Sequence, residues 1–220
     1  MELGTKEAAV SADTPIGGNL PIVTIFESYG SGASYVGPRV AEALGLPFHR
    51  QAFSSEEIEE AESRRENEGL IARVFGALGT SYGGVDVGDV TAAQRDTYEL
   101  TTENTRIVLD EAARGGVIVG RNGAFILADR PGALHVRLDG PLRQRVERAA
   151  RDSGIDLARA EKRQKREDQA RAVMSIDLYG WDPRRDEYYD LVINTGRLDL
   201  DTAVEIIVAA SRVRARQLQG

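Results

Sequence analysis

The stretch of sequence that decides the fold is PIVTIFESYGSGASYVGPRVAEAL, residues 21–44. Its first six residues, 21–26, are mostly apolar and β-branched, which is typical of a strand buried on both faces. Gly30 and Gly32 then mark a turn, and residues 33–44 carry apolar side chains at helical spacing. A strand, a glycine-rich turn and a helix in this order place backbone N–H groups at a helix N-terminus, where they can bind a phosphate.

Short apolar runs alternate with amphipathic segments along the rest of the chain. The runs predict further strands at 116–119, 133–138 and 190–193. The other patterns predict helices at 54–68, 91–114, 122–128, 141–152, 156–174 and 201–217. This alternation predicts an α/β fold, with a parallel sheet covered by helices on both faces. We expect a single domain at 20–220, with a helical insertion at about 51–114 and a lid region at about 155–185.

The composition limits the classes of protein to which the chain can belong. It has 220 residues, no cysteine and a formal net charge of -7. The absence of cysteine excludes disulfides and thiolate metal sites, and it suits a cytoplasmic protein. The net charge argues against a general nucleic-acid binder, and no apolar run approaches the roughly 18 residues of a membrane span. We therefore expect a small-molecule ligand, no nucleic acid and no membrane, and a disordered leader at 1–19, which lacks the apolar core of a signal peptide.

The glycine-rich turn matches the Walker pattern G-x-x-x-x-G-K-[ST] only in part. Gly32 and Ser34 stand at the second glycine and the hydroxyl, whereas Glu27 and Ala33 stand at the first glycine and the lysine. The motif alone is equally compatible with a turn that needs glycine for its backbone angles. If the loop binds a nucleotide, Ser34 is also the candidate ligand of Mg²⁺. The candidate phosphate- and nucleotide-binding residues are Gly30, Ser31, Gly32, Ala33, Ser34 and Tyr35.

Two sets of arginines could supply positive charge to this site. Arg121 follows a predicted parallel strand, and α/β proteins bind ligands at the carboxyl ends of their strands. Its guanidinium could hold a phosphate through two hydrogen bonds. Arg163, Arg166 and Arg171 fall on one broad face of a predicted helix, where Asp168 can pair with Arg171. The alternatives are an ion pair for Arg121 and a solvated, charged face for the helix.

The order and spacing of these segments resemble the cytidylate kinase-like family, which is of the P-loop nucleoside-monophosphate kinase type. The likeness rests on YGSG at 29–32, AEALGLPF at 41–48, VIVGR at 117–121 and DLVINT at 190–195. The resemblance implies a P-loop sheet and the transfer of a phosphoryl group from ATP, with Mg²⁺, to CMP, dCMP or a related small acceptor. It also implies that the acceptor binds Arg121 and Asn122, and that the catalytic lid residues are Arg163, Arg166, Asp168 and Arg171.

The chain departs from the family pattern at positions that carry charge. Glu27-Ser28 stands where members usually have Arg-Glu, Asn122 replaces an aspartate, and Glu167 stands where the first lid arginine is expected. Three hypotheses therefore remain: a nucleoside-monophosphate kinase, a kinase for a different small acceptor, and a catalytically degenerate nucleotide-binding or regulatory protein. The long predicted helix at 91–114 could in addition support a homodimer.

Overall fold

The computed structural model describes residues 20–51, 54–56, 59 and 90–217 of the chain. A five-stranded parallel sheet with the order β2-β3-β1-β4-β5 forms its centre. The strands are β1 (Ile22–Glu27), β2 (Phe48–His49), β3 (Gly116–Val119), β4 (Ala133–Asp139) and β5 (Leu191–Asn194). The helices are α1 (Ala33–Leu44), α4 (Val90–Ala113), α5 (Gly123–Ile126), α6 (Leu142–Ser153), α7 (Leu157–Tyr179), the short 3-10 helix η1 (Asp186–Tyr188) and α8 (Leu200–Gln217).

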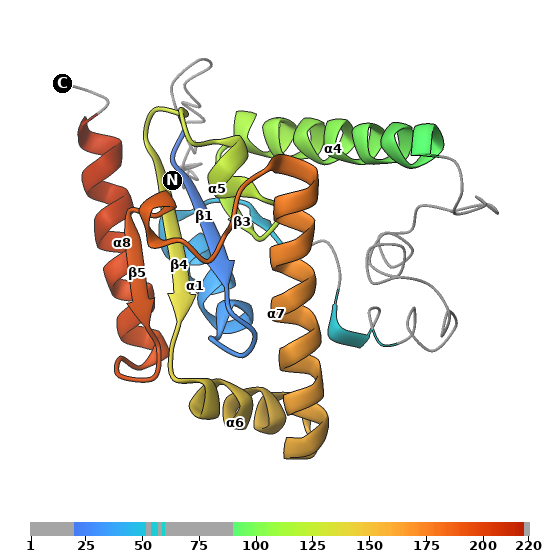
Figure 1. Ribbon diagram of the computed structural model, residues 1–220. Helices are drawn as coiled ribbons and strands as arrows, with labels where there is room; N and C mark the ends of the chain where they lie inside the picture. The colour runs from blue at the N-terminus through green and yellow to red at the C-terminus, as the bar shows by residue number, and fades with distance from the viewer. Residues whose placement is uncertain (1–19, 52–53, 57–58, 60–89, 218–220) are drawn as a thin grey trace, which may run out of the picture.

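Helices cover both faces of the sheet, which confirms the predicted α/β architecture (Figure 1). Successive side chains of β1 point to opposite faces. Val23 and Ile25 pack in a hydrophobic cluster with α1 and α8, whereas Ile22 packs with Val108 of α4 on the other face. The β1 strand is therefore buried on both faces, as its apolar sequence predicted.

Two helices enclose the carboxyl ends of the strands, where the site lies. In Figure 1, α6 lies below the arrowheads of β1 and β4, and α7 runs upward from α6 to α4. The α7 helix packs against both of these helices. A ligand at the strand ends would therefore have the loop after β1 on one side and α7 on another.

The structure differs from the sequence-based expectations at a few boundaries. The two-residue strand β2 was not predicted, because two residues carry no periodicity. The helix expected at 156–174 continues to Tyr179, and Gly180 ends it with a φ of 70°. Pro141, expected as the first helical residue, is instead the N-cap of α6, with an extended ψ of 128°. The predicted leader at 1–19 and most of the predicted helix at 54–68 lie outside the described residues.

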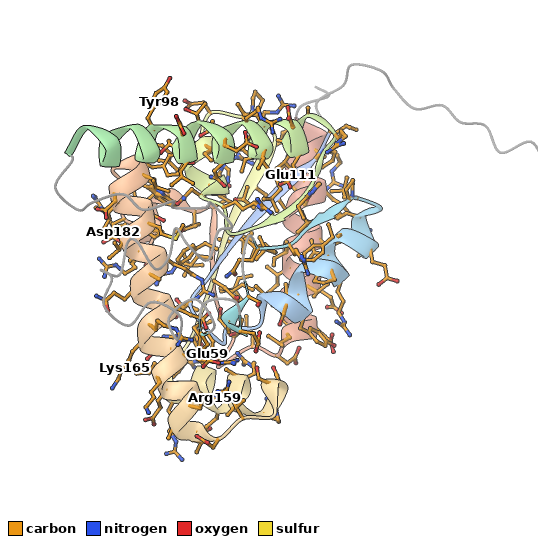
Figure 2. All side chains as sticks on the ribbon, turned by 90° about the vertical axis from the view of Figure 1, so that its right-hand side faces the viewer. Glu59, Tyr98, Glu111, Arg159, Lys165 and Asp182 are labelled. Atoms are coloured by element: carbon orange, nitrogen blue, oxygen red, sulfur yellow. The ribbon has the colours of Figure 1, made fainter. Side chains whose placement is uncertain are left out.

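The long helix α4 presents two large apolar side chains to solvent. Tyr98, labelled on the outer side of the helix in Figure 2, and Leu109 are both exposed. The homodimer expected from this helix stays a prediction. None of the described helices is long and apolar enough to cross a membrane.

Candidate active site at the carboxyl ends of the strands

The loop between β1 and α1 is held in a conformation that requires glycine. Gly30 has a φ of 76° and Gly32 a φ of 98°, both in the left-handed region that side chains disfavour. A Cβ atom at Gly30 would overlap the carbonyl oxygen of Arg145 on α6, and one at Gly32 would meet the side chain of Leu200. The two glycines therefore serve both the turn and the close approach of neighbouring helices.

The loop offers backbone donors to a ligand. Three of its N–H groups, those of Gly30, Gly32 and Ser34, have no acceptor among the residues that the structure describes. Together with the N-terminus of α1, they form a cradle that suits a phosphate. The described residues contain no cluster of three His, Cys, Asp or Glu side chains that could hold a metal ion. The Ser34 hydroxyl, at the second residue of α1, is the candidate Mg²⁺ ligand from the sequence, and this role stays a prediction.

Two arginines of α6 bind the loop between β1 and α1, and neither was predicted from the sequence. Arg145 donates from Nη1 to the carbonyl oxygen of Tyr29 at 2.8 Å. Arg148 donates from Nη1 to the carbonyl oxygen of Gly30 at 2.9 Å and from Nη2 to that of Thr195 at 2.6 Å. These bonds tie the loop to α6 and to the end of β5. The only signal for them was an Arg-x-x-Arg spacing inside a helix that contains several other arginines.

The carboxylate of Glu27 lies inside the loop. Its Oε2 accepts the N–H of Ala33 at 3.0 Å, and its Oε1 lies 4.0 Å from Nη2 of Arg171. Burial raises the pKa of the Glu27 carboxyl above its ordinary value, although Arg171 opposes this effect. Ala33 stands at the lysine position of the Walker pattern. The Glu27 carboxylate therefore accepts a backbone N–H that a nucleotide phosphate would otherwise accept. The shape of the loop thus fits a phosphate, while the charge of Glu27 opposes one.

Of the predicted lid residues, Arg171 and Asp168 lie at the loop. Asp168 accepts the N–H of Tyr29 through Oδ1 at 2.7 Å, which ties α7 to the loop. Nη1 of Arg171 lies 3.7 Å from Oδ1 of Asp168, so the pair expected from the sequence is present. Arg171 also binds Glu167, whose Oε2 lies 3.0 Å from Nη2. Burial raises the pKa of the Glu167 carboxyl.

The remaining lid arginines face acidic side chains. Arg163 is buried, and its guanidinium donates to Glu59 at 2.9 and 2.7 Å and to Glu56 at 2.8 Å. Arg159 also donates to Glu59 at 2.6 Å, and Figure 2 shows the two side chains together at the lower end of α7. Arg166 lies 3.6 Å from Glu59. We call Arg163, Glu56 and Glu59 the acidic clamp. The acidic clamp occupies the guanidinium of Arg163 with three hydrogen bonds, which leaves it poorly placed to meet a ligand. The catalytic role expected for Arg163 stays a prediction.

The acceptor candidates lie directly after β3, as expected from the sequence. Arg121 and Asn122 both have positive φ angles, of 54° and 56°. The Nε of Arg121 donates to the carbonyl oxygen of Arg50 at 3.3 Å. The Oδ1 of Asn122 accepts from Oγ of Ser175 at 2.6 Å and from Nε1 of Trp181 at 3.0 Å. Asn122 therefore orients the C-terminal half of α7, and Trp181 is a buried packing residue.

Two predicted nucleotide-binding side chains have other partners. The hydroxyl of Ser31, which is buried, donates to the carbonyl oxygen of Leu138 at 2.9 Å and holds the loop to β4. The hydroxyl of Tyr35 donates to Asp201 at 2.7 Å, and the guanidinium of Arg39 lies over its ring. The N–H of Ser31 also has a partner, because it donates to the carbonyl oxygen of Ser28 at 3.0 Å, so Ser31 supports the loop, and Tyr35 faces α8.

Two cavities open at this edge of the sheet and share three lining residues, Glu27, Gln51 and Arg171. One cavity, of about 450 Å³, is lined by the loop between β1 and α1 and by Arg148; we call it the loop cavity. The other, of about 350 Å³, is lined by Arg121 and Asn122 and by apolar side chains of α4 and α7; we call it the acceptor cavity. Arg163 and Tyr35 line neither cavity, whereas Arg171 lines both. The structure thus brings Arg171 together with Gly30, Gly32, Ala33 and Ser34 at one cavity and with Arg121 and Asn122 at the other.

A model of the cytidylate kinase-like family matches residues 22–197. The chain belongs to this family. Cytidylate kinase from Methanopyrus kandleri is 27% identical over 198 residues, which cover 86% of this chain and 92% of that protein. Cytidylate kinase from Ignicoccus hospitalis is also 27% identical, over 188 residues that cover 86% of this chain and 97% of that protein.

Two further proteins add to the comparison. A protein of Corynebacterium glutamicum named uronate isomerase is 40% identical over 130 residues, which cover 58% of this chain. The match spans only 25% of the length of that protein. The crystal structure of an uncharacterized protein from Eubacterium ventriosum superposes with a TM-score of 0.58 at 22% identity, and it covers 87% of this chain and 98% of the other. This last likeness supports the fold alone.

Proposed function

We propose that the protein is a phosphotransferase that moves a phosphoryl group from ATP to a small acceptor, with CMP and dCMP as the first candidates. The observation that carries this proposal is the pair of cavities that meet at Glu27, Gln51 and Arg171. A phosphate-binding loop lines one of them, and an arginine at a strand end lines the other. Family membership and the resemblance to archaeal cytidylate kinases support the same reaction.

Each part of the proposed site has a role in transfer. Backbone N–H groups of the loop hold the donor phosphates, and the Arg121 guanidinium holds the phosphate of the acceptor. An acceptor oxygen forms a bond to the γ-phosphorus as the bond to the β,γ-bridging oxygen breaks, and ADP leaves. Arg171 faces the negative charge on the transferring group, because it lines both cavities. Ser34 would hold Mg²⁺ together with the donor phosphates, and the ion would neutralise further negative charge there.

The proposal is tested by measuring ADP release from ATP and Mg²⁺ with a panel of nucleoside monophosphates. We expect turnover with CMP or dCMP that depends on the concentration of the monophosphate. The matched control for the site variant Arg171→Ala is Arg143→Ala, because Arg143 is exposed on α6 and pairs only with Glu147 among the described residues. Absence of turnover with every monophosphate at micromolar concentrations of folded enzyme would refute the reaction.

A second candidate function follows from Glu27. Its carboxylate occupies the N–H of Ala33, which favours a nucleotide-binding or regulatory protein that has lost catalysis. A thermal shift with ATP in the absence of turnover would support this alternative. No shift with any nucleotide would argue against both functions.

A further inference from the structure

We propose that Glu27 determines the affinity of the phosphate loop for a nucleoside triphosphate, and that the triphosphate binds with uptake of a proton by Glu27. This inference rests on the proposed nucleotide site. It goes beyond the proposed reaction because it assigns a role to a residue that stands where the family usually has an arginine.

The Glu27 carboxylate lies at the N-terminus of α1. Its Oε2 accepts the N–H of Ala33 at 3.0 Å, at the first residue of α1. The N-terminus of a helix attracts anions through its free N–H groups and its dipole. The Glu27 carboxylate, an anion of the protein itself, thus accepts one of the N–H groups that a phosphate would use. An ionised Glu27 and a phosphate compete for the same place.

Glu27 has little paired positive charge around it. Among the described residues, Arg171 is the only cation paired with Glu27, at 4.0 Å. The same guanidinium lies 3.0 Å from Glu167 and 3.7 Å from Asp168. Arg166 and Arg145 offset part of this charge, at 4.0 Å from Glu167 and 3.2 Å from Asp168 respectively. Arg50 and Arg148 also line the loop cavity and Arg121 lines the acceptor cavity, but among the described residues none of the three is paired with Glu27. Glu27 and a triphosphate would therefore share Arg171 with the two acids of α7.

Protonation of Glu27 removes this competition. Burial already favours the neutral form of Glu27, and Glu167 and Asp168 act in the same direction. A neutral carboxylic acid no longer repels the phosphates and releases Arg171 from one of its partners. Its O–H can then donate a hydrogen bond to a phosphate oxygen, as the N–H of a lysine would. In this way one proton converts the acidic side chain into a phosphate ligand.

The experiment measures ATP binding to the whole chain by isothermal titration calorimetry between pH 6 and 8, in buffers of different ionisation enthalpy. The test variant is Glu27→Gln, which keeps an oxygen for the N–H of Ala33 and is always neutral. The matched control is Glu147→Gln on the exposed face of α6. Circular dichroism confirms that each variant is folded, and the comparison with Glu27→Gln removes any proton taken up by ATP itself.

The wild-type protein is expected to bind ATP more tightly as the pH falls, by at most about tenfold per unit because one proton is involved. Glu27→Gln is expected to bind ATP about tenfold more tightly than wild type at pH 8 and to lose the protein's share of proton uptake. Glu147→Gln is expected to match the wild type. Equal affinity and equal pH dependence of wild type and Glu27→Gln would overturn this inference and leave the proposed reaction intact. If no folded variant binds ATP at any pH, the nucleotide site and the proposed function fail as well.

Discussion

Replacement of Arg163 by methionine tests whether this residue stabilises α7 or takes part in the reaction. Methionine keeps much of the apolar stem and removes the guanidinium. Arg163 is 1% exposed and donates three hydrogen bonds to Glu59 and Glu56. These two carboxylates therefore neutralise the charge of its guanidinium. We expect the variant to lose stability and to keep most of its activity.

The size of the loss can be worked from the contacts of the acidic clamp. Breaking a buried ion pair costs about 3–5 kcal/mol when it leaves one charge unpaired. Here Glu59 keeps Arg159 at 2.6 Å, and the mostly exposed Glu56 is free to be solvated. We therefore expect a loss of about 2–3 kcal/mol, below the range for an uncompensated charge. For a chain of this size, this corresponds to a fall in Tm of roughly 4–12 °C.

The assay is urea and thermal unfolding followed by circular dichroism, together with the turnover number of the same preparations. Arg143→Met is the matched control, since its side chain is 89% exposed and pairs with Glu147 one helical turn away. It should cost about 0.5 kcal/mol or less. The reasoning is refuted if Arg163→Met unfolds like the wild type and yet loses turnover. In that case Arg163 would be the lid cation that the sequence suggested.

Three further predictions follow from the same contacts. Arg171→Ala should lower the turnover number by about 10²–10³, because a preorganised cation is lost between the two cavities, and ADP release measures this directly. Gly30→Ala should weaken ATP binding at least about tenfold and cost about 1–3 kcal/mol of stability, since Gly30 has a positive φ and the alanine Cβ would overlap the carbonyl of Arg145. Unchanged ATP binding and unchanged unfolding would contradict the clash. Hydrogen bonds from Arg163 and Arg159 hold the pKa of Glu59 well below its usual 4.5, so the clamp stabilises the protein above about pH 4.5 and loses this contribution as the pH falls. The stability gap between wild type and Arg163→Met should therefore shrink in acid, and a gap that is constant from pH 7 to 3 would count against it.

The fold was accessible from the sequence because it depends on local patterns. The strand at β1, the glycine turn and the helix α1 each carry a signal within a few residues, and a strand buried on both faces, such as β1, has a mostly apolar sequence. The position of Arg121 after β3 was predicted in the same way, because the residue after a parallel strand lies at the carboxyl edge of the sheet, while its role in acceptor binding stays a prediction. The short strand β2 escaped because its pairing with β3, not its own sequence, makes it a strand.

The partners of the charged side chains were not accessible. Arg163 meets Glu59 across 104 positions of sequence, so the helix pattern that placed Arg163 on one broad face with Arg166 and Arg171 could not show what it contacts. Arg145 binds the loop through a backbone carbonyl, which every residue possesses and which leaves no trace in the sequence. The sequence did show that Glu27 brings negative charge to the loop. That its carboxylate binds the N–H of Ala33 depends on a side-chain rotamer and required the structure.

The central claim is that donor and acceptor bind in adjoining cavities that meet at Arg171. The most direct test is the Kd of a single ligand in which adenosine and cytidine are joined through five phosphates, measured by calorimetry beside ATP and CMP. If the loop cavity and the acceptor cavity adjoin as described, this ligand should fill both and bind about 100-fold more tightly than ATP, because its second half binds intramolecularly. A Kd no lower than that of ATP, with CMP still able to bind at the same time, would contradict the claim.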